Sequence, residues 1–374
     1  MIDALLTWLN DGCAERDNLR PRLTGGVVAG LYRNSSKVTL ILFDERGQLA
    51  AVAKATRRPS AEAALMAEFA ALKELTSTAP EAMQGAPLPI ALERVDGHLV
   101  LVESPVPGEP MTARYYSPGH TSDASRVARD FEAAEGWLER FQRKTASDEM
   151  VIDRVSIDAC VDGVRSRYRR EIGWSGVEEE LFETLARRAL AFEGTRLPRV
   201  GVHGDFWMGN LLMAEGRIVG VVDWELARLN GLPFQDTFKF PTSYGFYLDR
   251  AYPGNDGVVP GHSSWGRGRD RWARYGDWSN LVGFRYSYFE QGWFPTLVQQ
   301  FIERQLARAG VPLGLVSVFF PLFLAEQAMT LDDPVFRDGY RSALLAFWGE
   351  RESTWLWNEE KAGFSVRTLG GKDL

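Results

Sequence analysis

The sequence predicts an α+β protein built of two parts, a small antiparallel sheet with one helix and a larger, mainly helical part. Its 374 residues are about two and a half times the length of a typical single domain, so two domains are the default. Strand-like apolar runs and one helix come first, in the order β-β-β-α-β-β, and amphipathic helices follow at residues 126–144 and 178–192. We expect the two domains at residues 1–107 and 108–374.

Turn residues separate the strand-like runs of the first part. Residues 44–47 (DERG) separate one pair of strands, and Asp96-Gly97, the strongest hairpin signal in the chain, separates another. The helix between these pairs begins at Pro59, with Ser60 as its expected cap. After a first run near residues 23–30, the strands are expected at residues 38–43, 49–54, 89–95 and 98–103.

One charged residue lies within the apolar stripe of this helix. Glu68 comes three residues after Leu65 and four before Leu72, in the middle of the stripe. A buried carboxylate without a partner is costly, so we expect a cation beside it. Lys54, at the end of the preceding strand, is the nearest candidate, and Glu62 is the alternative partner for that lysine. The simpler interpretation leaves Glu68 turned to solvent and Lys54 solvated.

The last strand of the first part runs into a proline-rich segment, SPVPG at residues 104–108. Pro105 and Pro107 have no N–H group, whereas Ser104 and Val106 keep theirs. We interpret this segment as a hinge into the second part of the chain, with the boundary near residue 107.

The second part contains a short hairpin that carries amide and acidic side chains. If Glu215-Gly216 is its two-residue turn, Asn210 lies opposite Val221, and Asp223 lies two residues further along, about 8 Å away between Cα atoms. Two short oxygen-bearing side chains at that separation can share a hard cation such as Mg²⁺.

Asp205, on the loop before this hairpin, places a carboxylate beside the pair of expected metal ligands. That combination is the layout of a phosphoryl-transfer site. Each residue also has a simpler interpretation: Asp205 could cap its turn, His203 could be a structural histidine bonded to backbone, and Glu225 could merely flank the site. The combined spacing, rather than any single residue, favours the chemical interpretation.

The motif HGDxxxxN at residues 203–210, followed by DWE at residues 223–225, resembles the aminoglycoside phosphotransferase and choline kinase superfamily. These proteins are small-molecule kinases with the bilobal protein-kinase-like fold. The resemblance extends to the strand order, to Lys54 and Glu68, and to the hinge, so that it spans roughly residues 20–240. It implies an ATP- and Mg²⁺-dependent phosphotransferase in which Asp205 is the catalytic carboxylate at the acceptor hydroxyl and Asn210 and Asp223 are the Mg²⁺ ligands.

The same resemblance implies a nucleotide site in the first part. Lys54 would hold the α- and β-phosphates, Glu68 would position it, and the adenine would bind backbone groups near Ser104 and Val106. GTP in place of ATP stays open. The sequence has no G-x-G-x-x-G motif, so either Gly25-Gly26 or residues 33–37 could cover the phosphates, and the lack of a Walker A motif excludes the P-loop mechanism.

The composition is that of an ordinary soluble globular protein, with 45% hydrophobic and 25% charged residues. The net charge is −7 without a block of like charge, which argues against a nucleic-acid partner.

Cys13 and Cys160 are too few for a disulfide framework, and the first residues lack a basic signal-peptide region. The longest uncharged run, residues 309–325, contains two prolines and suits a buried helix better than a membrane span. We expect a cytoplasmic protein without a membrane partner, of undetermined oligomeric state.

The acceptor is the least determined part of this hypothesis. Residues 244–295, expected as an insertion, are more than twice as aromatic as the whole chain, of which 12% is aromatic. Aromatic faces suit sugar rings, nucleobases or apolar drug scaffolds, but they could equally pack the helices of a larger lobe. The same stretch carries Arg267, Arg269, Arg271 and Arg274, which argues mildly against polycationic aminoglycosides as acceptors.

Three functions therefore stay open. The first is an ATP-dependent kinase of a hydroxyl-bearing small molecule, either an antibiotic-inactivating enzyme for a glycosidic or nucleoside antibiotic or a metabolic sugar or amino-alcohol kinase. The second is a metal-dependent hydrolase that uses His203, Asp205, Asp223 and Glu225 as a cluster, and the third is a catalytically silent nucleotide-binding module. A hydrolase would not need the Lys54–Glu68 pair or the hinge, so nucleotide binding separates the first two.

Overall fold

A computed structural model describes residues 7, 10, 24–29, 37–246, 248, 272–276, 278, 280–330 and 333–357. The chain divides into two compact units. The first comprises residues 1–111 with 203–205 and 209–229, and the second comprises residues 112–202, 206–208 and 230–374. The domain limits expected from the sequence, 1–107 and 108–374, stay a prediction; the structure adds that the hairpin carrying Asn210 and Asp223 packs with the first unit.

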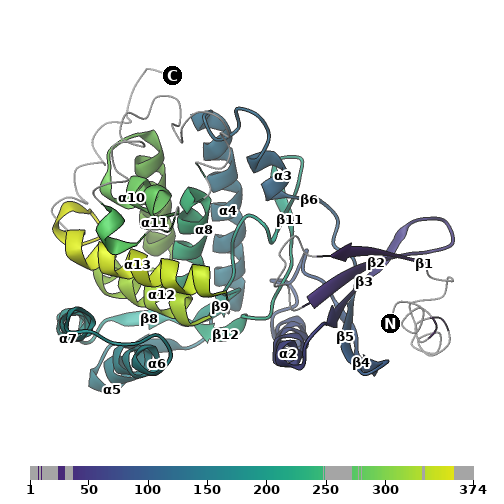
Figure 1. Ribbon diagram of the computed structural model, residues 1–374, viewed down its shortest axis with the longest axis horizontal. Helices are drawn as coiled ribbons and strands as arrows, with labels where there is room; N and C mark the ends of the chain where they lie inside the picture. The colour runs from purple at the N-terminus through teal and green to yellow at the C-terminus, as the bar shows by residue number, and fades with distance from the viewer. Residues whose placement is uncertain are drawn as a thin grey trace. The chain divides into compact units, whose positions relative to one another are not determined.

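The first unit is built on a five-stranded antiparallel sheet with the order β1-β2-β3-β5-β4 (Figure 1). This arrangement confirms the expected order of three strands, one helix and two strands. The helix α2 (Glu62–Thr78) comes between β3 and β4 in sequence and packs on β3, β4 and β5. The strands are β1 (Thr24–Ala29), β2 (Lys37–Phe43), β3 (Leu49–Thr56), β4 (Pro89–Val95) and β5 (His98–Glu103).

Two local features of this unit bear on the sequence predictions. The hairpin between β4 and β5 turns through Asp96 and Gly97, whose φ angles of 49° and 79° are those of the expected tight turn. The expected cap at Ser60 is wrong. A short 3₁₀ turn, Pro59–Ala61, precedes α2, and the extended residue before it is Arg58, so Ser60 lies inside the turn where its side chain caps nothing.

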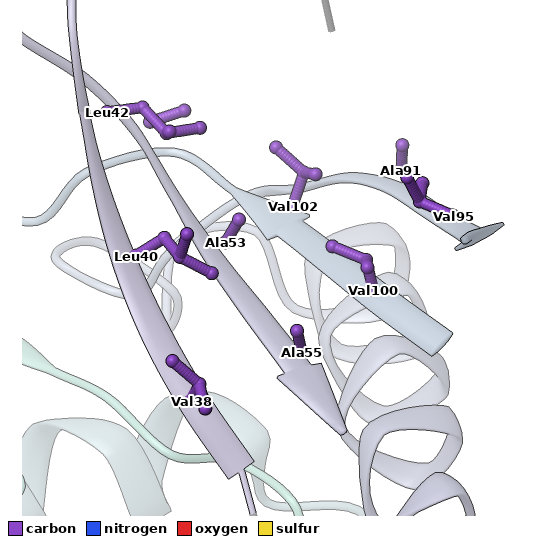
Figure 2. Packing of buried hydrophobic residues seen from close by; sticks show 10 residues of the cluster. Val38, Leu40, Leu42, Ala53, Ala55, Ala91, Val95, Val100 and Val102 are labelled. Carbon is purple, nitrogen blue, oxygen red and sulfur yellow. The ribbon is translucent and has the colours of Figure 1, made fainter. Parts of the chain in front are cut away.

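The two faces of the sheet have different contents because side chains alternate along each strand. One face is an apolar core whose members include Leu40, Ala53 and Val102, shown in Figure 2. The other face carries Leu99 and Leu101, which pack against Leu65 of α2. Lys54 and Glu103 have the same parity as Leu101 and therefore lie on the face that α2 covers.

The hairpin of β10 (Leu211–Ala214) and β11 (Arg217–Val221) corrects the predicted register. Its turn residues, Glu215 and Gly216, have positive φ angles of 49° and 76°, as expected for a two-residue turn. A β-bulge after Leu212 shifts the pairing by one residue, however, and the Val222 N–H donates to the Asn210 carbonyl at 3.0 Å. Asn210 thus lies opposite Val222 rather than Val221. Asp223 is one residue beyond, about 6 Å away between Cα atoms on ideal strand geometry.

Close backbone contacts join this hairpin to the rest of the first unit. The Val221 N–H donates to the carbonyl of Gly85, in the loop between α2 and β4, at 3.0 Å. A Cβ atom on Gly85 would lie 2.2 Å from the Val219 oxygen, and one on Gly220 would lie 2.1 Å from Val106 Cγ1. The short strand β6 (Glu109–Pro110) pairs with β10 on the other side. Glycine permits these approaches, which place β11 beside the loop before β4 and beside Val106.

The second unit is mainly helical, with an aromatic core. Phe131 of α4 contacts Phe240, Tyr244, Phe294 and Phe301 edge to face. The helices at 124–145 and 176–190 correspond to the two that the sequence predicts. The helices are α3 (Met111–Tyr115), α4 (Ala124–Thr145), α5 (Arg154–Ile157), α6 (Gly163–Glu171), α7 (Gly176–Leu190), α8 (Gln235–Phe246), α10 (Asn280–Phe289), α11 (Trp293–Arg308), α12 (Val316–Thr330) and α13 (Pro334–Glu350), and the short strands are β7 (Glu149–Val151), β8 (Arg196–Pro198), β9 (Val200–Val202) and β12 (Arg228–Gly231).

The aromatic stretch mostly packs the interior of this unit. Its buried members among the described residues are Tyr244, Phe246, Trp272, Trp278, Phe284, Tyr286, Tyr288 and Phe294. Arg274 forms an ion pair with Glu350. These contacts favour the packing interpretation over an aromatic acceptor surface. Tyr247, Tyr252, Trp265, Arg267, Arg269 and Arg271 lie outside the described residues.

One apolar stretch among the described residues is long enough to cross a membrane by length and composition. Residues Leu313–Thr330 have a mean hydropathy of 1.5, and 67% of that stretch is buried inside the protein. It includes α12, which packs against α13, α6 and α7. Such burial is typical of a core helix of a soluble protein.

The glycine at position 85 gives a test of the contact between the loop and the hairpin. Gly85→Ala places a methyl group against the Val219 carbonyl at a φ of +85°, so we expect it to lower stability by about 1–3 kcal/mol beyond the backbone strain alone. Gly47→Ala is the matched control, because Gly47 has a φ of +71° but nothing within 4 Å of its Cβ position. Thermal melts of both variants measure the difference. Equal melting temperatures would contradict the contact.

Candidate active site

A buried lysine with three carboxylates forms the centre of the first unit. The Lys54 Nζ atom lies 2.5 Å from Glu68 Oε1, 2.8 Å from Asp223 Oδ1 and 3.2 Å from Glu103 Oε2. Lys54 is 6% exposed and Glu68 is fully buried. The structure thus confirms the buried Lys54–Glu68 pair, and the interpretation with both groups solvated is wrong.

Glu68 also joins α2 to the segment that follows β11. Its Oε1 atom accepts a second hydrogen bond, from the Trp224 backbone N–H at 3.1 Å. The alternative partner Glu62 pairs instead with Arg94, which donates to it at 2.7 and 2.9 Å. The position of Glu68 in the apolar stripe, rather than at its edge, decides which of the two acids reaches Lys54.

The charges of this cluster shift one another's pKa values. Burial lowers the pKa of the Lys54 ammonium, but the carboxylates of Asp223, Glu68 and Glu103 outweigh burial and hold it well above the usual range. The Lys54 ammonium in turn holds the pKa of the Asp223 carboxyl well below its usual range. Burial raises the pKa of the Glu103 carboxyl to about 7, against the opposing effect of Lys54. Lys54 is therefore charged and Asp223 ionised at neutral pH.

Asp223 has an unusual backbone conformation. Its φ angle of 64° lies in the left-handed region, which costs a residue with a Cβ about 1–2 kcal/mol. The neighbouring hydrogen bonds, from Val222 to Asn210 and from Trp224 to Glu68, hold the backbone on both sides of it. The side chain keeps 43% of its surface exposed while one oxygen contacts Lys54. Strain of this kind is concentrated at functional sites.

Asp205 and Asn210 are in direct contact. The Asn210 Nδ2 group donates to both the backbone oxygen and the Oδ2 atom of Asp205, each at 3.0 Å. Both amide hydrogens are thereby used, so the Asn210 Oδ1 atom is the end of the side chain that can accept a hydrogen bond or bind a cation.

The loop that carries Asp205 is fixed by its neighbours. The His203 Nδ1 atom accepts from the Asp205 N–H at 3.3 Å, and the Nε2 atom, which therefore carries the hydrogen, donates to the Val222 carbonyl at 3.0 Å. A Cβ on Gly204 would lie 2.5 Å from the Leu226 oxygen. His203 thus has the structural role that the simpler interpretation gave it.

Glu225 forms an ion pair with Lys37, the first residue of β2. Burial lowers the pKa of the Lys37 ammonium, but Asp223 and Glu225 more than compensate, so that the pKa is raised. Lys37 therefore places a second ammonium near the Asp223 carboxylate. Of the two stretches expected to cover phosphates, Gly25 and Gly26 lie in β1, and Lys37 is the part of residues 33–37 that the structure describes.

The first hinge residue, Ser104, is hydrogen-bonded to the residue just before β4. The Ser104 N–H donates to the Leu88 carbonyl at 2.8 Å, and the Ser104 hydroxyl accepts from the Leu88 N–H at the same distance. Ser104 therefore cannot offer its N–H to a base, and its carbonyl is the backbone group that remains. Val106 lies two residues further on, packed against Gly220.

Comparisons with known proteins agree with this geometry. A model of the phosphotransferase enzyme family (APH) matches residues 35–251, more than half of the chain and the whole of the described cluster. This chain belongs to the phosphotransferase enzyme family. No curated protein sequence matches it.

Solved structures show the fold of this phosphotransferase. The apo form of a thermostable mutant of aminoglycoside phosphotransferase APH(4)-Ia is similar at 13% identity, covering 87% of this chain and 95% of that one with a TM-score of 0.50. Macrolide 2′-phosphotransferase MphH from Brachybacterium faecium is 16% identical, with coverage of 92% and 97% and a TM-score of 0.43. The predicted α+β, protein-kinase-like fold, with its antiparallel sheet and mainly helical second part, is confirmed.

Sequence reasoning did not foresee the ion pairs that Glu103 and Lys37 form in this phosphotransferase. A signal for Glu103 was present, because it shares the alternation of Leu99 and Leu101 in a strand that ends beside the hinge. Lys37 was expected only as the end of residues 33–37, a stretch that could cover the phosphates, and nothing in the sequence signalled its ion pair with Glu225.

The donor set of the phosphotransferase suits Mg²⁺ better than a hydrolytic metal cluster. The ionised Asp223 carboxylate and the Asn210 amide oxygen are hard oxygen ligands, which Mg²⁺ prefers. Within the described ranges, no group of three or more His, Cys, Asp or Glu residues is arranged to hold a metal ion. The hydrolase alternative, which needs such a group, gains no support.

Removing Glu68 tests the central ion pair. Glu68→Ala leaves the buried Lys54 without its closest partner and deprives the Trp224 N–H of its acceptor, so we expect a loss of about 3–5 kcal/mol in unfolding free energy. The control is Glu62→Ala on the same helix, whose exposed pair with Arg94 should leave the melting temperature nearly unchanged. Thermal or urea unfolding measures both. Similar melting temperatures for the two variants would show that the pair does not stabilise the unit.

Proposed function

We propose that this phosphotransferase moves the γ-phosphate of Mg-ATP to a hydroxyl group of a small molecule. The observation that carries the proposal is the buried Lys54 held by Glu68 beside the half-exposed, ionised Asp223. A buried ammonium surrounded by carboxylates is costly to maintain, and it is useful where a polyanion must be bound.

The proposed roles follow from what each group has available. Lys54 has three N–H donors and three carboxylate partners, so it can bind a phosphate oxygen only if one partner moves away. Asp223, the most exposed of the three, is the partner that can turn. Asn210 Oδ1 and the Asp223 carboxylate would hold Mg²⁺, which neutralises charge on the phosphates.

Asp205 is proposed as the catalytic carboxylate. The Asn210 amide holds its Oδ2 atom, which fixes the orientation of the carboxylate toward an acceptor. In phosphoryl transfer such a carboxylate orients the attacking hydroxyl and takes its proton.

The acceptor class is proposed from the family and from chemistry. The structurally similar APH(4)-Ia is described as an aminoglycoside phosphotransferase, so a hydroxylated antibiotic is the first class to test. The arginine-bearing stretch argued against a polycationic acceptor, which favours a glycosidic or nucleoside antibiotic. A metabolic sugar or amino-alcohol kinase is the alternative, and in either case we propose a cytoplasmic enzyme.

Nucleotide binding tests the proposal directly. Calorimetry with a nonhydrolysable ATP analogue and Mg²⁺ should give saturable binding, and Lys54→Ala should weaken it because the phosphates lose their buried cation. Lys73→Ala is the control, because Lys73 is an exposed lysine on helix α2 of the same unit. This variant should bind the nucleotide like the wild type. No heat and no thermal shift at millimolar nucleotide would contradict the proposed function.

Asp205→Asn and Asp223→Asn should fail in different ways. With an acceptor found by screening hydroxylated antibiotics and sugars for acceptor-dependent ADP release, Asp205→Asn should lower turnover by about 10²–10⁴-fold with nearly unchanged nucleotide affinity. Asp223→Asn removes a metal ligand, so its loss should be partly recovered at high Mg²⁺.

Asp96→Asn serves as the control for these two variants, because it makes the same change at an exposed turn where asparagine tolerates the positive φ angle. Its turnover should equal that of the wild type. Near-native turnover of Asp205→Asn would remove Asp205 from the catalytic role, and equal loss of Mg²⁺ affinity in Asp205→Asn and Asp223→Asn would favour the hydrolase.

A further inference from the structure

A second lysine lies on the same face of the sheet as Lys54. Lys37, the first residue of β2, is the register partner of Thr56, whereas Lys54 is the partner of Thr39, two residues further along β2. Partners across two strands point to the same face, and so do residues two apart along one strand. The two lysines are therefore diagonal neighbours on one face, about 7–8 Å apart between Cα atoms.

The register also places Lys37 further from the hinge than Lys54. Along β3, Val52 is the partner of Glu103, the last residue before the hinge, and Lys54 is two residues beyond Val52. Lys37, opposite Thr56, is one such step further, which is about 7 Å at the usual rise of a strand. The order along this face is therefore the hinge, then Lys54, then Lys37.

Lys37 is less buried than Lys54, and both ammonium groups lie near Asp223. The Lys37 side chain is 19% exposed, against 7% for Lys54, and it forms an ion pair with Glu225, whose side chain is 30% exposed. Burial lowers the pKa of Lys37, but the charges of Asp223 and Glu225 outweigh burial and raise it. Asp223 also contacts Lys54 at 2.8 Å. The carboxylate proposed to hold Mg²⁺ is therefore attracted by two cations.

We propose that Lys37 binds the γ-phosphate of the nucleotide and that Glu225 is its partner when this phosphate is absent. The order along the sheet face is the order of the groups in the nucleotide, with the base proposed at the hinge, the α- and β-phosphates at Lys54 and the γ-phosphate next. A phosphate and a carboxylate are both anions that an ammonium binds as a point charge, so they compete for Lys37. This inference rests on the proposed function, and it adds the residue that recognises the group to be transferred.

Such a contact makes the protein discriminate between the substrate nucleotide and the product nucleotide. ATP and ADP share the base and the α- and β-phosphates, and only ATP carries the γ-phosphate. Lys37 therefore strengthens the binding of ATP, whereas ADP, formed when the γ-phosphate has moved to the acceptor, leaves Lys37 paired with Glu225. Specificity is a difference of affinities, so the ratio of the affinities for ATP and ADP measures this contact.

A purely structural role for the ion pair predicts a different result. The pair joins the start of β2 to the segment after β11, and it could serve only to hold these two segments together. In that case, breaking the pair from either side has the same effect on nucleotide binding. If the ammonium binds the γ-phosphate, loss of Lys37 and loss of Glu225 have different effects, because only the first removes the cation.

The test is calorimetric binding of a nonhydrolysable ATP analogue and of ADP, each with Mg²⁺ and without an acceptor. The wild type should bind the ATP analogue about tenfold or more tightly than ADP, as expected for hydrogen bonds to a charged group. Lys37→Gln should lower this ratio by about tenfold or more, mainly through weaker binding of the ATP analogue. Lys37→Arg keeps the positive charge and should keep most of the ratio.

Two further variants are matched controls. Glu225→Gln breaks the same ion pair but leaves the ammonium, so its ratio should equal or exceed that of the wild type. Lys54→Gln removes the cation proposed for the α- and β-phosphates, which both nucleotides carry, so it should weaken the binding of both by a similar factor. If Lys37→Gln does not fold in a thermal melt, the wild-type comparison of the ATP analogue with ADP still decides, because equal affinities would overturn the γ-phosphate contact.

The outcomes also separate this inference from the proposed function. An unchanged ratio in Lys37→Gln, or the same fall of the ratio in Lys37→Gln and Glu225→Gln, would overturn the γ-phosphate contact while the phosphotransferase proposal stands. Absence of binding of either nucleotide to the wild type would overturn both.

Discussion

The buried ammonium of Lys54 is the interaction on which the first unit depends. Its three carboxylate partners come from α2, from the end of β5 and from the segment after β11, so one charge joins the helix, the sheet and the hairpin. Removing Glu68 would take the closest carboxylate from a lysine that is only 6% exposed, and breaking a buried ion pair in this way costs more than the net worth of the pair. The cluster therefore connects three elements of the first unit and also holds a buried ammonium that can bind an anion.

The hairpin of β10 and β11 positions Asn210 and Asp223 through its backbone geometry and not by apolar packing alone. A bulge in the pairing of β10 and β11 moves Asn210 opposite Val222, and the left-handed Asp223 then turns its side chain toward Lys54. The glycines at positions 85 and 220 let this hairpin approach the loop before β4 and the hinge. Strain at Asp223 is offset by bonds on both sides of it, which is how a fold can maintain a costly conformation where chemistry needs it.

The hinge and the lysine cluster meet at Glu103. Alternation along β5 gives this carboxylate the same face as Lys54, while its place at the strand end brings it beside Ser104. Because Ser104 uses its own N–H within the sheet, its carbonyl is the backbone group that remains at the end of β5. The backbone groups that a binding site can offer thus depend on which N–H and carbonyl groups are already hydrogen-bonded within the sheet.

The sequence by itself determined the strand order and the tight turns at Asp96-Gly97 and Glu215-Gly216, because alternation and turn chemistry are local rules. Helical spacing also pointed to the Lys54–Glu68 pair but left a solvated arrangement open, and the structure decided between them. It could also place Asn210 and Asp223 on one hairpin and Asp205 on the loop before it, although their catalytic and metal roles stay predictions. Only the tertiary structure decided the register shift at Leu212, the hydrogen bond from the Ser104 N–H to Leu88, the burial of Glu103 and the ion pair of Lys37 with Glu225. These depend on which distant segments come together, and neither a bulge nor the partner of a buried charge follows from neighbours in the chain.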